Sequence, residues 1–430
     1  MRKIAFFGIF GHSRYTYSEA MHRCDAMPRS SGTGLKNLLE LYEVTDNKGN
    51  MIHGEAPARM LQSDREKSCY VSVHALVESG WSAKRISEEL NARFDLVVFS
   101  TANAIRPNLD PGCTAEVLDG LRTDFIVLGM GMQNPLPQTT ESLHPNLIQL
   151  LEICNRKARI FGVRGLETRD WLRSVGFTHA TALGCPSMYV YPKNILGISA
   201  PDPARVTSAI TGGYINGRVP RSSAIIQLFK GFDAHYVMQE EMASWKQQGF
   251  LDAVHDIYND ATGEICRDTV NHILKEIHDE DMPFSSYRWF QDPNAWRMFA
   301  SRFDIYLGDR LHGGIAALQA GVPAIMLAED RRVIEIADFF NIPRISIQDA
   351  ESTPLIDIIA DRLSTTSIDA FKTTYLERFR EFETTFKEAG IPLTVSADNI
   401  RQTMAPQSDI VPRGKKRATI RFIRRILRKF

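Results

Sequence analysis

Short apolar runs alternate with helical patterns along most of the chain, and this alternation constrains the fold more than any other feature. Strands are expected at 4–9, 96–99, 125–128, 159–163 and 180–183, and again at 206–210, 235–238, 304–307, 324–327 and 344–347. Helices are expected between them at 82–93, 145–157, 167–175, 295–302, 314–320 and 331–340. Strands that are apolar on both faces and separated by helices predict parallel sheets covered on both sides. Residues 11–80 show no comparably regular pattern, and 30–34 are typical of a loop.

The strands fall into two sets, which a stretch with three prolines at 191–203 separates. A chain of 430 residues is long enough for two domains of about 150–200 residues each. The fold class predicted is therefore α/β, with two doubly wound domains at 1–192 and 203–395 that face a central cleft. Within the second domain, 367–389 has the apolar stripe of a long closing helix, and 396–412 has the composition of a linker. Because ligands of such sheets bind beyond the carboxyl ends of the strands, the site is expected in the cleft.

Composition narrows the class of protein. The 51 basic and 51 acidic residues cancel, which argues against nucleic acid as a partner of the folded body. The six cysteines are scattered without a CxxC pair, as in proteins of a reducing cytoplasm. The N-terminus lacks the apolar length of a signal peptide, and no run of 18 apolar residues is present. We therefore expect a cytoplasmic protein.

The loop Asp309-Arg310-Leu311-His312-Gly313 is the sharpest candidate for a binding site. It joins an apolar strand to a helix, and the free N–H groups of a helix N-terminus favour anions. Glycine lets a ligand approach the backbone, and Arg310 has the planar fork that suits phosphate or carboxylate. His312 has the chemistry to bond phosphate or to move a proton. The alternative is that the glycines only make a tight turn, which His312 caps.

Two further positions end expected strands of the first domain. Arg164, flanked by glycines, is predicted to point into the cleft, although a salt bridge to a neighbouring loop would also explain it. Cys185 closes the next strand in the segment Leu-Gly-Cys-Pro-Ser. No base lies beside it in the sequence, so a buried thiol is expected there rather than a nucleophile.

These segments, in this order, resemble the polysaccharide pyruvyl transferase family. The matching segments are GVRGLETRDWLRSVGF at 162–177, LGCPS at 183–187, WRMFASRFDIYLGDRLHG at 296–313, AALQAGVPA at 316–324, DRRVIEI at 330–336 and NIP at 341–343. The resemblance covers about 125–343. It implies two Rossmann-like halves, similar to those of GT-B nucleotide-sugar glycosyltransferases.

The activity implied is transfer of pyruvate from phosphoenolpyruvate onto two hydroxyls of a sugar, which forms a cyclic ketal in the biosynthesis of a bacterial surface polysaccharide or capsule. Carried over by motif, Arg164, Arg310, His312 and Arg332 match positions associated with the phosphoenolpyruvate site, and Gly313 lies beside them. His312 and Arg310 are the candidate catalytic residues. Asp309, Glu335 and His12 are weaker candidates for proton transfer. The scheme requires no cofactor and no metal, and no cluster of histidine, cysteine and aspartate has metal-ligand spacing along the chain.

The acceptor side departs from the family's pattern. The family commonly opens with Gly-Asn-x-Gly-Asp, whereas this chain has a different turn that contains His12. Asn103 lies where a glycine pair often follows the strand, while Gly129, Gly131 and Gln133 match the family's Gly-x-Gly-x-Gln turn. These five positions are the candidates for contact with the acceptor, a sugar or a lipid-linked oligosaccharide.

The tail at 413–430 contains nine basic residues and no acidic one. As a helix it would be amphipathic, which predicts peripheral binding to an anionic membrane surface; a solvated tail is the alternative. Two other functions also stay open. One is a glycosyltransferase that binds a nucleotide sugar at the same loop, with Glu329 or Glu335 on the ribose. The other is a non-catalytic relative.

Overall fold

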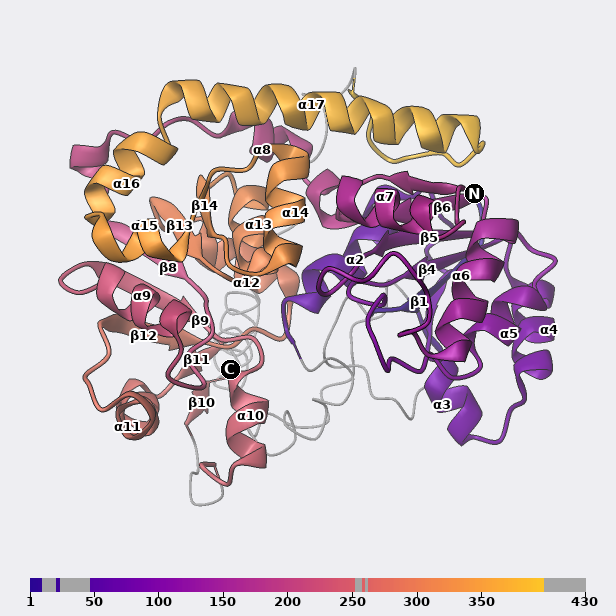
Figure 1. The fold of residues 1–430 in the computed structure, drawn as a ribbon, viewed down its shortest axis with the longest axis horizontal. Coiled ribbons are helices and arrows are strands. Elements are labelled where there is room, and N and C mark those ends of the chain that lie inside the picture. Colours follow the sequence, from indigo (N-terminus) through magenta and orange to yellow (C-terminus); the bar gives the residue numbers. More distant parts are fainter. Residues whose placement is uncertain (10–20, 24–46, 252–256, 260–261, 398–430) are drawn as a thin grey trace, which may run out of the picture.

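The computed structural model describes residues 1–9, 21–23, 47–251, 257–259 and 262–397. Its two β-sheets lie side by side, one in each half of the chain (Figure 1). The described part contains no helix that is both long and apolar enough to cross a membrane. His12, residues 398–412 of the expected linker and the basic tail lie outside the described residues. The predictions made for them, including binding to a membrane surface, stay predictions.

The N-terminal half is built on a seven-stranded sheet of order β2-β3-β1-β4-β5-β6-β7, in which only β2 and β3 pair antiparallel. Its strands are β1 Ile4–Gly8, β2 Met21–Arg23, β3 Cys69–Val71, β4 Leu96–Ser100, β5 Phe125–Met130, β6 Ile160–Val163 and β7 Ala180–Ala182. Its helices are α2 Asn50–Met60, α3 Val73–Glu78, α4 Ala83–Arg93, α5 Thr114–Asp119, α6 Pro145–Lys157 and α7 Leu166–Ser174. The central strands β4 and β5 are buried throughout, as strands covered on both faces must be.

The C-terminal half is built on an eight-stranded sheet of order β10-β11-β12-β9-β8-β13-β14-β15. Its strands are β8 Ser208–Thr211, β9 Asp233–Val237, β10 Tyr258–Asn259, β11 Glu264–Ile265, β12 Phe284–Arg288, β13 Ile305–Gly308, β14 Ala324–Leu327 and β15 Arg344–Ile345. Its helices are α9 Pro220–Leu228, α10 Glu241–Gln247, α11 Arg267–His278, α12 Pro293–Ala300, α13 Leu311–Gln319, α14 Arg331–Phe340, α15 Ile347–Ser352 and α16 Leu355–Arg362. The short helices η2 Pro186–Tyr189, α8 Pro192–Gly197 and η3 Pro203–Arg205 connect the halves. Two Rossmann-like sheets with parallel cores confirm the predicted fold class.

The sequence pattern did not predict strands that lack a continuous apolar run. The central strand β12 has the sequence FSSYR, and only Phe284, Ser286 and Tyr287 are buried. The pairs β10–β11 and β11–β12 are antiparallel, so one edge of the sheet departs from the expected parallel pattern. The first 80 residues also hold α2, β3 and α3, where no regular pattern was apparent.

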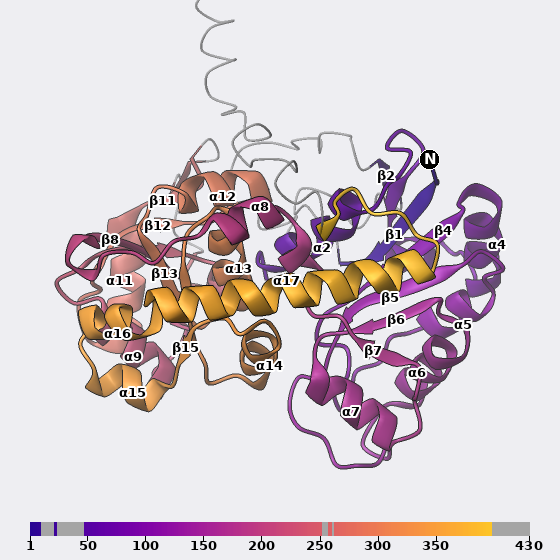
Figure 2. The same ribbon diagram turned by 90° about the horizontal axis from the view of Figure 1, so that it is seen from above.

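The long helix α17, Thr365–Glu388, lies across both halves (Figures 1 and 2). All six residues of its expected apolar stripe are buried: Ile368, Phe371, Tyr375, Phe379, Phe382 and Phe386. The chain then returns to the N-terminal half, where Gln62 N donates to Pro392 O at 3.1 Å and Thr394 N donates to Met60 O at 2.8 Å. Arg2 Nη2 reaches Gly390 O at 3.1 Å. The closing helix and the segment that follows it therefore contact both halves. The domain limits at 192 and 203 stay a prediction.

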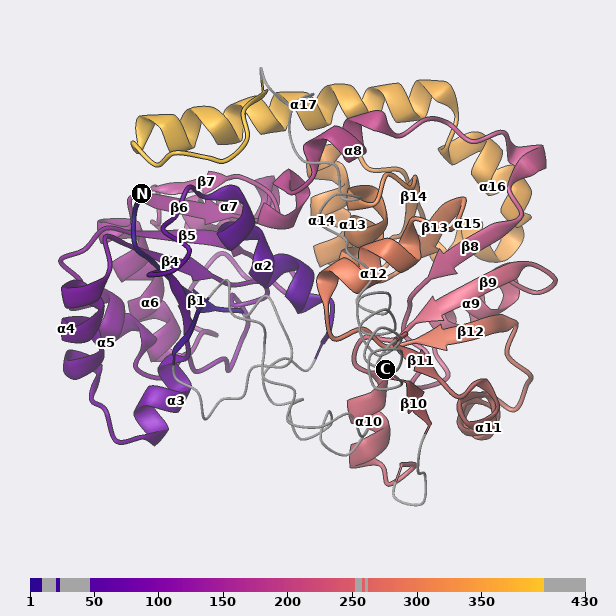
Figure 3. The same ribbon diagram turned by 180° about the vertical axis from the view of Figure 1, so that it is seen from behind.

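Helix α2 lies where the two halves meet (Figure 3). Its Glu55 pairs with Arg297 of α12, whose side chain is completely buried, and with Arg59 at 2.7 Å. Arg297 also donates to Gln319 Oε1 at 2.9 Å, and Arg59 to Asn294 Oδ1 at 2.9 Å. A buried charge is costly unless it is paired and hydrogen-bonded. Because Glu55 and Arg297 satisfy each other across the two halves, this network fixes α2 against the C-terminal half.

The Glu55 network should make stability depend on pH. Burial alone would raise the pKa of the Glu55 carboxyl, but Arg297 and Arg59 outweigh it and lower that pKa below its ordinary value of 4.5. A lowered folded pKa contributes stability above the unfolded value, and this contribution is lost as the pH falls through the folded value. We expect urea unfolding to show a larger stability gap between wild type and Glu55→Gln at neutral pH than below about pH 4. Glu88→Gln, on the exposed face of α4, is the control; a gap independent of pH would contradict the assignment.

Candidate active site

The candidate residues lie at the carboxyl ends of strands from both sheets. Arg164 directly follows β6, Asn103 lies three residues beyond β4, and Gly131 directly follows β5. On the other side, β13 leads into the first turn of α13, which carries His312. The halves touch here, because His312 Nε2 lies 3.7 Å from Cys185 Sγ. This is the edge where doubly wound sheets bind ligands.

Arg164 is almost fully buried, with 2% of its surface exposed. Its Nη1 donates to Asn103 Oδ1 at 2.6 Å, while Nε has no hydrogen-bond partner among the described residues. An arginine donor left without a partner in a buried setting is costly unless a ligand completes it. The side chain of Arg164 is thus held by a hydrogen bond to an amide rather than by a salt bridge to a neighbouring loop, and its orientation into a cleft stays a prediction.

Two glycines of the expected acceptor turn, Gly129 and Gly131, pack closely against the side chains of His53 and Arg164. Gly129 has φ +76°, and a Cβ there would lie 2.4 Å from Cε1 of His53. A Cβ on Gly131 would lie 3.0 Å from Cβ of Arg164. Gln133 accepts a hydrogen bond from Arg106 Nη1 at 3.1 Å on the surface. The two glycines therefore make room for His53 and Arg164, and the side-chain contact observed for Gln133 is outside the cluster.

Cys185 lies between two imidazoles. His53 Nδ1 of α2 is 3.4 Å from its Sγ, His312 Nε2 is 3.7 Å away, and Ser187 Oγ is 2.9 Å away. The two rings meet edge to face with centroids 5.8 Å apart. The expectation that Cys185 is a buried thiol holds, but its reason was wrong: two bases lie beside it, brought there by α2 and α13.

The surroundings of these groups are electropositive. Burial, followed by Arg164 and Arg332, lowers the pKa of His312 to about 3. Burial, His312 and Arg164 likewise lower the pKa of His53 well below its ordinary value. Burial raises the pKa of the Cys185 thiol, and the hydrogen bond with Ser187 and the charge of Arg164 only partly offset this. At neutral pH the cluster thus holds two neutral imidazoles, a thiol and nearby guanidinium charges.

Arg310 is placed differently from His312, although the two are neighbours in the loop. Its Nη2 pairs with Glu240 Oε1 at 2.7 Å and lies 3.7 Å from Glu241 Oε1, and its Nε donates to Gly213 O at 3.0 Å. These carboxylates outweigh burial and raise the pKa of Arg310. In this conformation Arg310 anchors the loop to α10, so direct contact with a donor would require it to leave these partners. Its binding and catalytic roles stay predictions.

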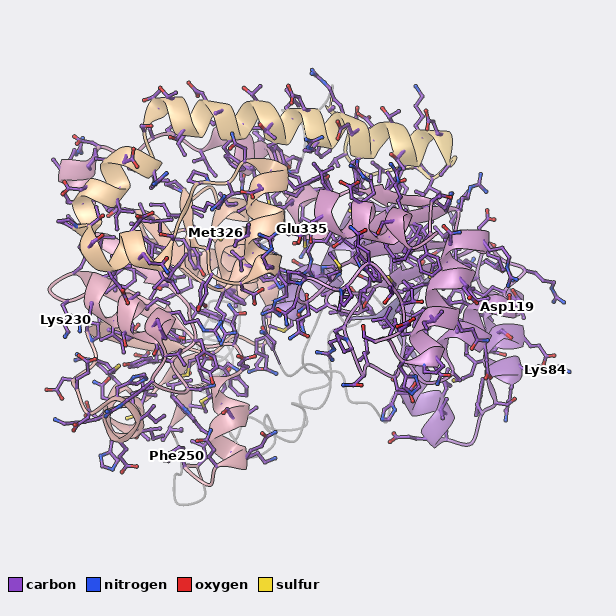
Figure 4. The ribbon with its side chains drawn as sticks, in the orientation of Figure 1. Lys84, Asp119, Lys230, Phe250, Met326 and Glu335 are labelled. Atoms are coloured by element: carbon purple, nitrogen blue, oxygen red, sulfur yellow. The ribbon has the colours of Figure 1, made fainter. Side chains whose placement is uncertain are left out.

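Residues near the start of α14 complete the cluster. Arg332 Nε donates to Asp330 Oδ2 at 2.7 Å, and its charge reaches both His312 and Arg164. Glu335 accepts hydrogen bonds from Thr168 N at 2.7 Å and Thr168 Oγ1 at 3.0 Å, and burial raises the pKa of its carboxyl. Glu335 lies toward the middle of the molecule, whereas Lys84 and Lys230 lie at its outer edges (Figure 4). Glu335 thus ties the C-terminal half to α7.

The other predicted residues are packed into the loop. A Cβ on Gly313 would lie 2.9 Å from the hydroxyl of Tyr306, so glycine is required there for close packing. The buried Asp309 carboxylate accepts from Tyr214 N at 3.2 Å, and burial raises its pKa. Glu329 lies 3.8 Å from Arg221.

His53 is the member of the cluster that sequence reasoning missed. It lies in α2, of which eight residues are buried: Met51, Ile52, His53, Gly54, Glu55, Ala56, Pro57 and Met60. A helix buried on nearly all sides has no apolar stripe, so its periodicity is silent. The only local signal is a histidine followed by glycine, which is too common to identify a site.

Comparison with known proteins supports the family resemblance. The family model described as polysaccharide pyruvyl transferase matches residues 47–331. Among solved structures, Anabaena Alr3699/HepE in complex with UDP and glucose has 10% identity and a TM-score of 0.43, over 96% of this chain and 100% of that chain. The UDP-GlcNAc 2-epimerase from Methanocaldococcus jannaschii has 11% identity and a TM-score of 0.37, over 70% of this chain and 80% of that chain. These likenesses are too distant to carry a ligand or an activity to this chain.

A comparison with curated proteins gave no match. The matched segment 47–331 nevertheless contains His53, Arg164, Cys185 and His312 and spans well over half of the 430 residues. The chain belongs to the polysaccharide pyruvyl transferase family.

Proposed function

We propose that the protein transfers pyruvate from phosphoenolpyruvate onto two hydroxyls of a sugar acceptor. The observation that carries this proposal is that the charges of Arg164 from one half and Arg332 from the other both act on His312, at the N-terminus of α13, and lower its pKa after burial has done so. Family membership supports transferase chemistry on a polysaccharide precursor.

The charges suit a small phosphorylated acid. Phosphoenolpyruvate carries a carboxylate and a phosphate, and arginines remain charged at any relevant pH. Arg164 Nε has no hydrogen-bond partner among the described residues. No side chain of that part of the chain caps the N-terminus of α13, whose first N–H groups can bind anions. Arg332 adds a partly exposed guanidinium that is ion-paired with Asp330. Together these groups offer donors to both ends of one anion.

The reaction needs proton transfer and stabilisation of the leaving group. The terminal carbon of the enol gains a proton, and the central carbon is attacked by one sugar hydroxyl. The C–O bond to phosphate breaks, and a second hydroxyl closes the ketal; of the two hydroxyl protons lost, one balances the new methyl group and one leaves with phosphate. Arg164 and Arg332 would stabilise the departing phosphate. His312 lies in the anion loop, where it would bond the phosphate or relay a proton.

His312→Gln tests this assignment. We expect at least a 100-fold loss in phosphate release from phosphoenolpyruvate in the presence of acceptor, within the range typical of a positioned proton donor or acceptor. His272→Gln, on the exposed face of α11, should keep full activity. Normal turnover in His312→Gln would remove His312 from the chemistry.

Ligand binding separates the competing functions. The full chain should be titrated calorimetrically with phosphoenolpyruvate and, separately, with UDP. Binding of phosphoenolpyruvate that weakens in Arg164→Met supports pyruvyl transfer. Binding of UDP alone would indicate a glycosyltransferase, and the absence of phosphate release with every acceptor tested would indicate a non-catalytic relative.

A further inference from the structure

His53, Cys185 and His312 each direct one potential metal-ligand atom toward the same point. One ligand atom of each residue lies within 4.8 Å of the other two. The sulfur-to-nitrogen distances are 3.4 Å to His53 Nδ1 and 3.7 Å to His312 Nε2. In a tetrahedral zinc site, Zn–S and Zn–N bonds of about 2.3 and 2.0–2.1 Å separate sulfur from nitrogen by about 3.6 Å. The two observed separations lie on either side of that value.

We propose that His53 Nδ1, Cys185 Sγ and His312 Nε2 form a binding site for a divalent transition metal of the zinc class, with the fourth position open. Two imidazoles and one thiolate are a donor set that such ions favour, and three protein ligands with an open position are typical of a catalytic rather than a structural site. The ligands are 132 and 127 residues apart in sequence, so spacing along the chain gave no sign of them.

The ligands are held by rigid elements. His53 is fully buried in α2, Cys185 immediately precedes η2, and His312 lies in the first turn of α13. His312 is the one of the three residues that is not fully buried. Ser187, also fully buried, places its hydroxyl 2.9 Å from the sulfur, where it would donate to a thiolate, and its carbonyl accepts from Gln319 Nε2 at 2.7 Å. Such outer hydrogen bonds orient and tune metal ligands.

The charge balance sets the conditions for binding. The metal takes the sulfur as thiolate, and the displaced thiol proton leaves to solvent. The guanidinium of Arg164 opposes a cation here, and the thiolate offsets one charge. The open position would then take water or an oxygen of an anion.

Cobalt(II) is the probe, because a thiolate bound to tetrahedral cobalt gives charge-transfer absorption in the near ultraviolet and intense bands in the visible. The full chain carrying Cys266→Ser, which removes an exposed thiol, should show both features and saturate at one equivalent. Adding Cys185→Ser should abolish the near-ultraviolet band, and adding His53→Gln should weaken cobalt binding at least tenfold. Cys154→Ser, a buried thiol in the core of the N-terminal half, should leave the spectrum unchanged.

A thermal measurement guards against variants that fail to fold. Zinc should raise the Tm of the parent protein progressively with concentration and displace cobalt, but it should not raise the Tm of Cys185→Ser. No thiolate band at one equivalent in the parent, or a band that survives in Cys185→Ser, would overturn the site. These readouts need no donor or acceptor. The two proposals are therefore tested independently. Cobalt binding can be absent although phosphoenolpyruvate binds and reacts, and it can be present although phosphoenolpyruvate does not bind.

Discussion

Replacing Arg164 with methionine should weaken the binding of phosphoenolpyruvate 10- to 100-fold. Methionine keeps much of the apolar volume of the side chain but removes the charge and every donor. One arginine–phosphate contact contributes about 1.5–3 kcal/mol, which corresponds to that range of affinity. Asn103 would lose its partner as well, so its carbonyl would be left in a half-buried position. The measurement is the dissociation constant for phosphoenolpyruvate, with the KM taken under the same conditions.

Arg122→Met is the matched control for this experiment. Arg122 is exposed and precedes β5, so it lies at the opposite end of the sheet from Gly131 and Arg164. It should change the affinity less than twofold. Equal losses in both variants would show that Arg164 acts through net charge alone. An unchanged affinity in a well-folded Arg164→Met protein would remove this residue from the donor site.

Arg297→Met should produce the largest loss of stability, about 3–5 kcal/mol. The side chain of Arg297 is completely buried, and its removal leaves Glu55 with Arg59 as its only charged partner among the described residues. A buried carboxylate that loses a partner keeps the cost of its desolvation, which is larger than the net contribution of the intact pair. Urea unfolding at neutral pH measures the change in the free energy of unfolding.

A double variant separates the pairing from the space that it fills. Glu55→Met combined with Arg297→Met removes both charges, and stability should return toward the wild-type value, because apolar replacement of a whole buried pair is often close to neutral. Arg344→Met serves as the surface control, because its pair with Asp338 is exposed on both sides and should contribute less than about 1 kcal/mol. A double variant less stable than Arg297→Met alone would contradict this account.

The alternation of apolar runs and helical patterns was enough to predict the two sheets, because β4, β5, β13 and β14 are buried on both faces and carry continuous apolar sequences. The stripe of α17 was predicted for the related reason that one face of a helix is buried and the other is exposed. Strand β12 and helix α2 break these rules. Serines occupy β12, and α2 is buried on nearly every side, so neither has the expected period.

The candidate site divides in the same way. Arg164 and His312 were predicted because each follows an apolar strand that ends beside a glycine. The partners of the site residues come from elsewhere in the chain. His53 of α2 lies against His312, Glu240 at the start of α10 pairs with Arg310, and Asp330 ahead of α14 pairs with Arg332. Nothing local in the sequence distinguishes Arg310, which is paired with Glu240, from Arg164, whose Nε lacks a partner among the described residues. That difference depends on tertiary packing.

The return of the chain after α17 has a consequence for biosynthesis. Residues 390–394 bond back to Arg2, Met60 and Gln62, so the N-terminal half includes segments from both ends of the described chain. A ribosome makes the first 182 residues, with every strand of that sheet, long before it makes these. Domains that are continuous in sequence can fold as they emerge, from the N-terminus onward. Here the N-terminal half is expected to complete its folding only after translation has passed residue 394. Until then the backbone around Leu61 lacks its partners at 392–394.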